Sequence, residues 1–141
     1  MITLNHLRNI CKMSQEELLE YLPLQLTAYG YAEPVCTGDY IYAAGTIPVL
    51  LVAHLDTIFR KLPEFIFHDQ LENVMWSPEG LGADDRVGVY AILRIIETGL
   101  KPHILFTTLE EKGCVGAIIA ASELKPDVNF VIALDLKGSD C

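Results

Sequence analysis

The sequence has few basic residues and no long apolar segment. It contains 10 Lys and Arg against 19 Asp and Glu, so its formal net charge at pH 7 is −9 over 141 residues. Because nucleic-acid binding depends on positive side chains that neutralise phosphates, this balance argues against nucleic acid as a partner. The longest apolar run, Ile47 to Ala53 with Pro48 included, is far shorter than the roughly 18 residues that span a bilayer, so we expect no membrane span.

The N-terminal segment also lacks the pattern of a signal peptide. It has no continuous apolar stretch followed by a cleavage site of small residues, and we therefore expect a cytoplasmic protein. The four cysteines are widely spaced and form no C-x-x-C pair, which argues against a zinc ribbon or a redox motif. We expect buried or reducible thiols instead.

The composition indicates a folded protein with one core. Hydrophobic residues make up 51% of the sequence and charged residues 21%, which is too apolar for intrinsic disorder. The sequence shows no internal repeat, no low-complexity tract and no linker rich in proline and glycine. We therefore expect residues 1–141 to form a single domain.

Local patterns in the first half predict a helix followed by strands. Ser14 and Glu17 form a capping box before a row of leucines, which predicts a helix from Gln15 to Tyr21 that ends before Pro23. Residue types typical of strands follow at 39–43 and 47–53, and a hairpin is expected with arms at 65–67 and 73–76.

The second half alternates between helix and strand patterns. We expect a buried helix over 86–98, a strand over 104–109, a helix over 115–124 and a buried strand over 130–134. With the strand at 47–53 this gives a β-α-β-α-β order, in which the strands pair in parallel. The sequence therefore predicts an α/β fold.

Possible metal ligands follow the ends of these strands. In open α/β sheets, ligands bind beyond the carboxyl ends of the strands, where the chain carries His54 and Asp56, Glu110 and Glu111, and Asp135. A further pair, Asp84 and Asp85, follows a loop with two glycines and opens the buried helix. Imidazole and carboxylates suit zinc, manganese or cobalt, whereas clustered acids without a cation repel one another.

Each of these signals has an ordinary structural explanation when it stands alone. A His-x-Asp pair is more often a structural histidine with a hydrogen-bonded acid, and Glu110 with Glu111 is more often a solvated strand end. Asp84 with Asp85 is typical of a helix N-terminus, where the helix dipole favours acids, and Asp135 alone could be a turn residue. The metal-site interpretation depends on their conjunction at one edge of the predicted sheet.

Four ordered motifs resemble a known enzyme family. The segments AHLDT (53–57), GLGADDRVG (80–88), TTLEEKGCVGA (107–117) and ALDLKG (133–138) are similar to those of the co-catalytic zinc exopeptidases, which include deblocking aminopeptidases and tripeptidase-like enzymes. The resemblance covers about residues 47–138. It implies a three-layer α/β sandwich with a mixed, largely parallel sheet, in a truncated or miniature form.

The resemblance also implies a role for each site residue. His54 and Asp135 would bind a first metal ion, Asp84 would bridge two ions, and Glu111 would bind the second. The ions would be zinc, with cobalt or manganese as alternatives. Asp56 would orient the His54 imidazole, and Glu110 would be the general base that takes a proton from metal-activated water. The peptide bond from Asp84 to Asp85 would be cis, and peptides would be the substrates.

The sequence departs from the family pattern in one respect. The family's second metal ion takes a late histidine, but the other histidines of this chain, His6, His68 and His103, all precede Asp135 and fall outside the motifs. The chain could be a piece of a longer protein, a naturally short form, or half of a site that another chain completes.

We expect a homo-oligomer or a partner chain that supplies the missing half. Two other interpretations stay open at this point. One is a catalytically incomplete metal-binding homologue or interaction module, and the other is an acidic α/β domain with solvated carboxylates.

Overall fold

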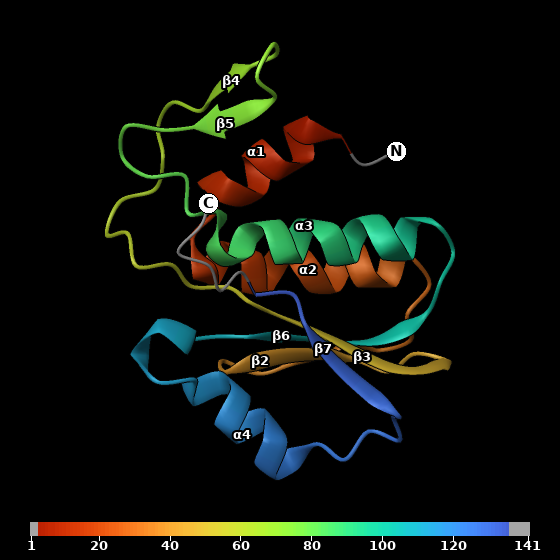
Figure 1. Ribbon diagram of the computed structural model, residues 1–141. Coiled ribbons are helices and arrows are strands. Elements are labelled where there is room, and N and C mark those ends of the chain that lie inside the picture. Colours follow the sequence, from red (N-terminus) through yellow and green to blue (C-terminus); the bar gives the residue numbers. More distant parts are fainter. Residues whose placement is uncertain (1–2, 136–141) are drawn as a thin grey trace.

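The computed structural model describes residues 3–135, which form three layers. A mixed sheet with the strand order β1-β2-β6-β3-β7 lies in the middle of the described chain. Helices α1, α2 and α3 lie on one face of this sheet and α4 lies on the other (Figure 1). A small sheet made of β4 and β5 stands apart beyond α1. The predicted three-layer α/β architecture is confirmed.

Two helices open the described chain: α1 (Leu4–Lys12) and α2 (Gln15–Ala28). The capping box at α2 forms as predicted, because Ser14 Oγ accepts a hydrogen bond from the Glu17 amide at 3.1 Å, and the Glu17 carboxylate accepts one from the Ser14 amide at 2.7 Å. Each bond satisfies an amide that the helix itself leaves unpaired.

The prediction that this helix ends before Pro23 is wrong, since α2 continues through the proline to Ala28. Pro23 has no amide to donate to the Leu19 carbonyl, and the Cys36 thiol donates to that carbonyl instead, with Sγ 3.5 Å from the oxygen. The helix also buries leucines on both sides of the proline, at positions 18, 22 and 26. Their packing against the sheet outweighs the unfavourable proline, an effect that local sequence patterns do not contain.

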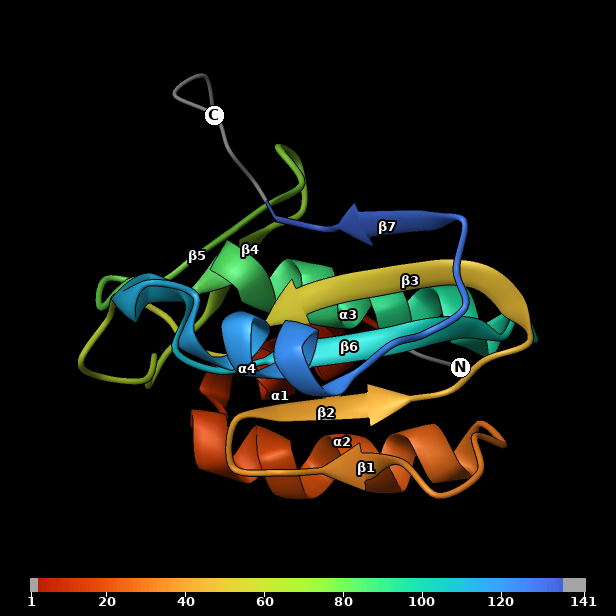
Figure 2. The same cartoon turned by 90° about the horizontal axis from the view of Figure 1, so that it is seen from below.

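The sheet combines an antiparallel side with a parallel side. Strand β1 (Val35–Cys36) pairs antiparallel with β2 (Tyr40–Ala43), and β2 pairs antiparallel with β6 (Pro102–Thr107). Strand β3 (Ile47–His54) lies between β6 and β7 (Phe130–Ala133) and is parallel to both. In Figure 2 the arrows of β3, β6 and β7 point the same way, so their carboxyl ends share one edge.

Strand β6 ends two residues before the predicted end at Leu109. Leu109 has a φ of 54°, in the left-handed region, so the chain turns there into a short 3₁₀ helix, η1 (Glu110–Lys112).

The prediction that strand β7 is buried is wrong. The side chains of Phe130, Val131 and Ile132 are 67%, 63% and 46% exposed. Within residues 3–135, β7 pairs only with β3, so one of its edges carries no neighbouring strand. An apolar sequence run predicts that a strand can be buried, but it does not show which element covers it.

The predicted hairpin forms two residues later than expected on its first arm. Strand β4 (Phe67–Asp69) pairs with β5 (Val74–Trp76), so Phe65 and Ile66 precede the strand. The Asp69 carboxylate accepts hydrogen bonds from the amides of residues 71 and 72, which closes the turn, and the Phe67 and Trp76 rings stack with centroids 4.7 Å apart.

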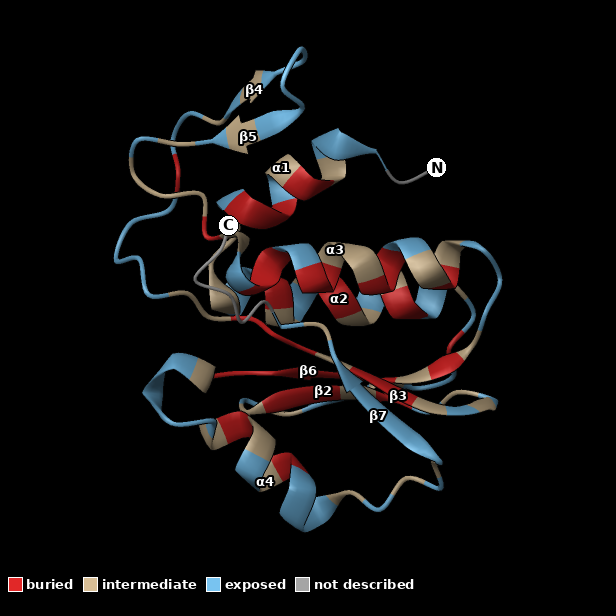
Figure 3. Cartoon of the chain, viewed as in Figure 1, coloured by how far each residue is buried: buried red, intermediate tan, exposed pale blue. Residues whose placement is uncertain are grey.

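The main core lies between the sheet and the helices α1, α2 and α3 (Ala83–Glu97) (Figure 3). Its fully buried members include Leu18 and Leu22 of α2, Ile92 of α3, and Phe106 of β6. A smaller cluster around Tyr40, Leu50, Leu105 and Ala120 packs α4 (Val115–Glu123) against the other face.

Two further sequence expectations concern cysteines and membrane spans. Cys11 is buried, and Cys36 and Cys114 are exposed, and all of them are free thiols; Cys141 lies outside the described residues. Within the described part of the chain, no helix is both long and apolar enough to cross a membrane.

Candidate metal centre

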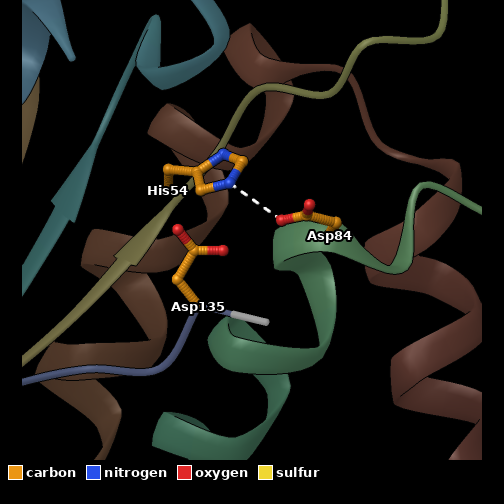
Figure 4. Close-up of side chains that lie close together, drawn as sticks. All are labelled: His54, Asp84 and Asp135. Carbon is orange, nitrogen blue, oxygen red and sulfur yellow. Dashed lines mark hydrogen bonds and ion pairs between the residues drawn. The ribbon is translucent and has the colours of Figure 1, made fainter. Parts of the chain in front are cut away.

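The predicted site residues lie together at the edge where β3, β6 and β7 end. His54 is the last residue of β3, Asp84 lies at the start of α3, Glu110 and Glu111 belong to η1 after β6, and Asp135 follows β7. Figure 4 shows the side chains of His54, Asp84 and Asp135 converging from separate elements. The expectation that these residues share one edge of the sheet is confirmed.

Two groups of side chains are arranged so that they could hold a metal ion. One group is His54, Asp84 and Asp135, and the other is His54, Glu110 and Glu111; within each group the ligand atoms lie within 4.8 Å of one another. His54 Nε2 lies 3.0 Å from Asp84 Oδ1 and 4.0 Å from Glu110 Oε2. The first group is the set that the resemblance implies for the first ion. The second group shares His54, whereas the resemblance implies that Asp84 is shared.

The His54 imidazole is buried and bordered by carboxylates. Only 4% of its surface is exposed, and its Nδ1 lies 3.2 Å from Asp56 Oδ1 and 3.1 Å from the Asp56 carbonyl oxygen. Burial acts to lower the pKa of His54, but hydrogen bonds and charges of Asp56, Asp85 and Asp84 outweigh it and raise the pKa to about 9. The contact at Nδ1 leaves Nε2 directed toward Asp84 and the ligand groups.

Asp56 does more than orient the imidazole. Its Oδ1 accepts a hydrogen bond from the Glu110 amide at 2.9 Å, and its Oδ2 accepts one from the Glu111 amide at 3.1 Å. Burial acts to raise the pKa of Asp56, but these bonds and the His54 contact lower it further than burial raises it. One carboxylate therefore connects the end of β3 to η1 and positions the backbone of both glutamates.

Asp85, which the sequence offers together with Asp84 as a possible ligand or as an acid at a helix N-terminus, belongs to neither ligand group. Its side chain is 2% exposed, and its carboxylate accepts hydrogen bonds from the amides of His54 and Gly88, each at 3.1 Å. Burial raises the pKa of Asp85 to about 7, although these two contacts oppose the increase. The sequence does contain a signal for this role, because Asp85 stands three residues before Gly88 at the start of a helix. A helix-capping side chain with this spacing accepts a hydrogen bond from the amide of the third helical residue, here Gly88.

Gly88 allows this arrangement. A Cβ atom at position 88 would overlap the Asp85 carboxylate, so glycine lets the carboxylate approach the backbone of α3. The peptide bond between Asp84 and Asp85 is cis, as the family resemblance implies. Asp84 belongs to a ligand group, whereas the Asp85 carboxylate accepts a hydrogen bond from the His54 amide.

The charges of the cluster favour a cation. Burial and the negative charge of Asp84 raise the pKa values of both Glu111 and Asp135. Such repulsion is relieved when a divalent ion binds, and a donor set of one imidazole and several carboxylates suits zinc, cobalt or manganese. Among residues 3–135 no other histidine joins either group: His6 contacts Thr3, His68 lies in β4, and His103 stacks on Tyr42.

Cavities border the cluster on two sides. A cavity of about 870 Å³ is lined by Asp56 and Glu111 together with residues of the segment 57–62 and the start of α2. A second cavity, of about 490 Å³, is lined by Asp84, Asp85 and Asp135 and is mostly apolar elsewhere. Three of the candidate ligands, Asp84, Glu111 and Asp135, therefore line space that a small molecule can enter.

The fold is similar to that of solved peptidases. A tripeptidase from Staphylococcus aureus subsp. aureus Mu50 superposes with a TM-score of 0.77 and 22% sequence identity, over 96% of this chain and 43% of the tripeptidase. The dipeptidase Dug1p from Saccharomyces cerevisiae has a TM-score of 0.72 and 14% identity, over 94% of this chain and 38% of Dug1p. The aminopeptidase PepT from Bacillus cereus ATCC 10987 has a TM-score of 0.69 and 17% identity, over 96% of this chain and 43% of PepT.

These comparisons establish a shared fold. No protein-family model matches the sequence, and no curated protein sequence matches it either. The chain spans less than half the length of each of the three peptidases. Nearly the whole of this chain therefore superposes on a part of each peptidase.

We predict that the metal-free protein loses stability as the pH rises from about 6.5 to 9. The pKa of His54 is about 9 in the folded chain, against an ordinary value of 6.5, so between these values the folded state holds a proton that the unfolded chain has released. The raised pKa of Asp85, about 7 against 3.8, acts in the same direction at lower pH. Urea unfolding in the presence of a chelator, at pH 6.5 and at pH 9, measures this effect. His54→Gln should show a smaller fall in the unfolding midpoint, and an equal fall in both proteins would contradict the assignment.

Proposed function

We propose that this chain carries the metal centre of a peptide hydrolase of the aminopeptidase type. The observation that carries the proposal is the convergence of His54, Asp84 and Asp135 at the carboxyl edge of a fold that three solved peptidases share. Because the chain spans less than half of each of those proteins, the activity and the substrate are part of the proposal.

His54, Asp84 and Asp135 would hold one divalent ion, which we propose to be zinc, with cobalt or manganese as alternatives. Glu111 would serve a second ion, with Asp84 between the two. When bound, a divalent ion supplies a Lewis acid that polarises a peptide carbonyl and lowers the pKa of water. Asp56 would keep Nδ1 of His54 occupied, so that Nε2 is the nitrogen available for ligation.

Glu110 would act as the general base. Its backbone is held by Asp56, one of its carboxylate oxygens lies 4.0 Å from His54 Nε2, and the other accepts a hydrogen bond from the Cys114 thiol at 3.4 Å. In this position Glu110 can take a proton from the water that adds to the scissile carbonyl carbon. It can then deliver that proton to the amine nitrogen as the C–N bond breaks.

A second candidate function is a metal-binding homologue without catalysis, or an interaction module. It is favoured by the composition of the second ligand group, to which no described histidine other than His54 contributes. In this alternative the first group would bind an ion, and peptide bonds would not be hydrolysed. Measurements of bound metal and of hydrolysis separate the two functions.

We predict that the protein retains about one zinc ion per chain after zinc loading and dialysis. His54→Ala should lose it, because His54 belongs to both ligand groups. His68→Ala is the matched control, since His68 lies in the β4–β5 hairpin and in neither group. Elemental analysis of the three proteins tests the site; equal zinc in the two variants, or none in the parent protein, would overturn it.

We predict that Glu110→Gln lowers the hydrolysis of peptides with a free amino terminus by about 10²- to 10⁴-fold, the usual contribution of a general base. The amide keeps the size of the side chain but cannot accept the proton. The zinc ion that we assign to His54, Asp84 and Asp135 should be retained, because Glu110 is not a member of that group. Glu20→Gln, on an exposed position of α2, serves as the control. A chelator should abolish hydrolysis, and added zinc or cobalt should restore it. Unchanged turnover in Glu110→Gln would exclude this residue as the base, and no chelator-sensitive hydrolysis in the parent protein would favour the non-catalytic alternative.

We further propose a homo-oligomer, or a partner chain that supplies the missing half of the second site. The support is β7, an exposed apolar strand at an edge of the described sheet, because such edges pair readily with other strands. Light scattering at micromolar concentration should give more than one chain per particle. Val131→Lys should reduce that mass, whereas Leu71→Lys, at the 95% exposed tip of the hairpin, should not. The mass of a single chain for the parent protein would contradict the homo-oligomer.

We also propose a cytoplasmic location, where the free thiols at positions 11, 36 and 114 would stay reduced.

A further inference from the structure

Arg86 is a buried cation close to the candidate metal centre. It lies near the start of α3 and is only 2% exposed. Within the described chain its guanidinium makes one hydrogen bond, from Nη1 to the Ile10 carbonyl oxygen at 3.4 Å, and its Nε has no partner. No carboxylate of residues 3–135 lies within ion-pair distance of it. Since a buried charge is costly unless it is paired, Arg86 has binding capacity that the described residues leave unused.

Arg86 also lines the larger of the two cavities. This cavity, of about 870 Å³, borders the metal centre through Asp56 and Glu111. A ligand held at Arg86 would therefore extend toward the cluster of candidate metal ligands. The volume is sufficient for a ligand of a few amino-acid residues.

The remaining wall of the cavity is apolar in one part and basic in another. Ile58, Phe59 and Leu62 contribute apolar side chains, and each of them is more than 40% exposed, at 69%, 43% and 42%. Arg60 and Lys112 add positive charge. The cavity thus offers an apolar surface beside cationic groups, which suits a ligand with an apolar body and a negative end.

The described acids that line the same cavity form no ion pair with Arg86: burial lowers the pKa of Arg86, and the charges of Asp56 and Glu16 oppose that decrease only from a distance. Both oxygens of Asp56 already accept hydrogen bonds from the amides of Glu110 and Glu111. Glu111 belongs to a ligand group of the metal centre, and Glu16 lies on an exposed position in the first turn of α2. None of these carboxylates forms an ion pair with Arg86 in the described chain.

We propose that this cavity binds a small apolar carboxylate, with Arg86 as the residue that pairs with the carboxylate and the side chains of residues 58, 59 and 62 as the apolar wall. A guanidinium can hold a carboxylate through two parallel N–H···O bonds, which gives orientation as well as affinity. The ligand is either the C-terminal residue of a peptide or a free carboxylic acid that acts as an effector. The first source rests on the proposed peptide hydrolysis, and the second does not.

Binding of N-acetyl-leucine and N-acetyl-leucinamide to the metal-free protein tests the site without any turnover. The two probes differ only in whether the end is a carboxylate or a neutral amide. Titrations followed by amide chemical shifts should show at least about ten-fold weaker binding of the amide, with the largest shifts at residues that line the cavity. Equal affinity of the two probes would overturn the proposal.

Two variants of Arg86 and one control complete the experiment. Arg86→Met removes the charge and keeps a side chain of similar length. Arg86→Lys keeps the charge but loses the planar guanidinium that can form two parallel hydrogen bonds with a carboxylate. Both variants should bind N-acetyl-leucine at least about ten-fold more weakly. Arg94→Met is the control, because Arg94 lies on the same helix, is 45% exposed and pairs with Glu97 outside the cavity. Thermal unfolding establishes that each variant is folded. Unchanged N-acetyl-leucine binding in folded Arg86→Met would contradict the role of Arg86.

Hydrolysis of Ala-Leu and of Ala-Leu amide then distinguishes the two sources. If kcat/KM falls at least about ten-fold on amidation, and Arg86→Met removes this difference, the ligand is the C-terminal residue of a peptide. If amidation has no effect while N-acetyl-leucine still binds through Arg86, the ligand is a free carboxylic acid. Carboxylate-dependent binding without hydrolysis would leave the site in place and refute only the proposed function.

Discussion

The parallel pairing of β3 with β6 on one side and β7 on the other is the interaction on which the rest of the structure depends. It aligns the carboxyl ends of three strands, so that each chain segment leaving the sheet there contributes a polar residue to the same small volume. The helices that cover the sheet bury apolar side chains of β3 and β6, such as Leu51 and Phe106. The apolar residues of these strands therefore determine where the polar residues meet, although the candidate chemistry belongs to His54 at the end of β3 and to residues that follow the strands.

Two carboxylates that belong to neither ligand group fix the position of His54. Asp56 contacts its imidazole and holds the backbone of η1, and Asp85 accepts a hydrogen bond from its backbone amide while capping α3. Through these two acids, β3, η1 and α3 are joined at a single histidine. The geometry of the cluster consequently depends on the second layer of hydrogen bonds as much as on the ligand groups.

Much of this arrangement could be predicted from the sequence, because the strong local signals agree with the final packing. Apolar runs predicted β3, β6 and the helix α4, and the residues after the strands predicted the cluster. Where prediction failed, the deciding contact was distant in the chain. Pro23 lies inside a helix because leucines on both sides of it pack against the sheet, and β7 is exposed because no described element covers it. The role of Asp85 was missed since it depends on an amide 31 residues earlier, and the cavity at Arg86 exists only once α2, α3 and the segment 57–62 are assembled.

The order of the ligands along the chain has a consequence for biosynthesis. His54 is made early and Asp135 late, and the strand that positions Asp135 has to pair with β3 before the first ligand group is complete. A ribosome-bound chain that lacks β7 would present His54 and Asp84 without their third member. The first ligand group therefore forms only when β7 has paired with β3, whereas the members of the second group, His54, Glu110 and Glu111, are all present in the shorter chain.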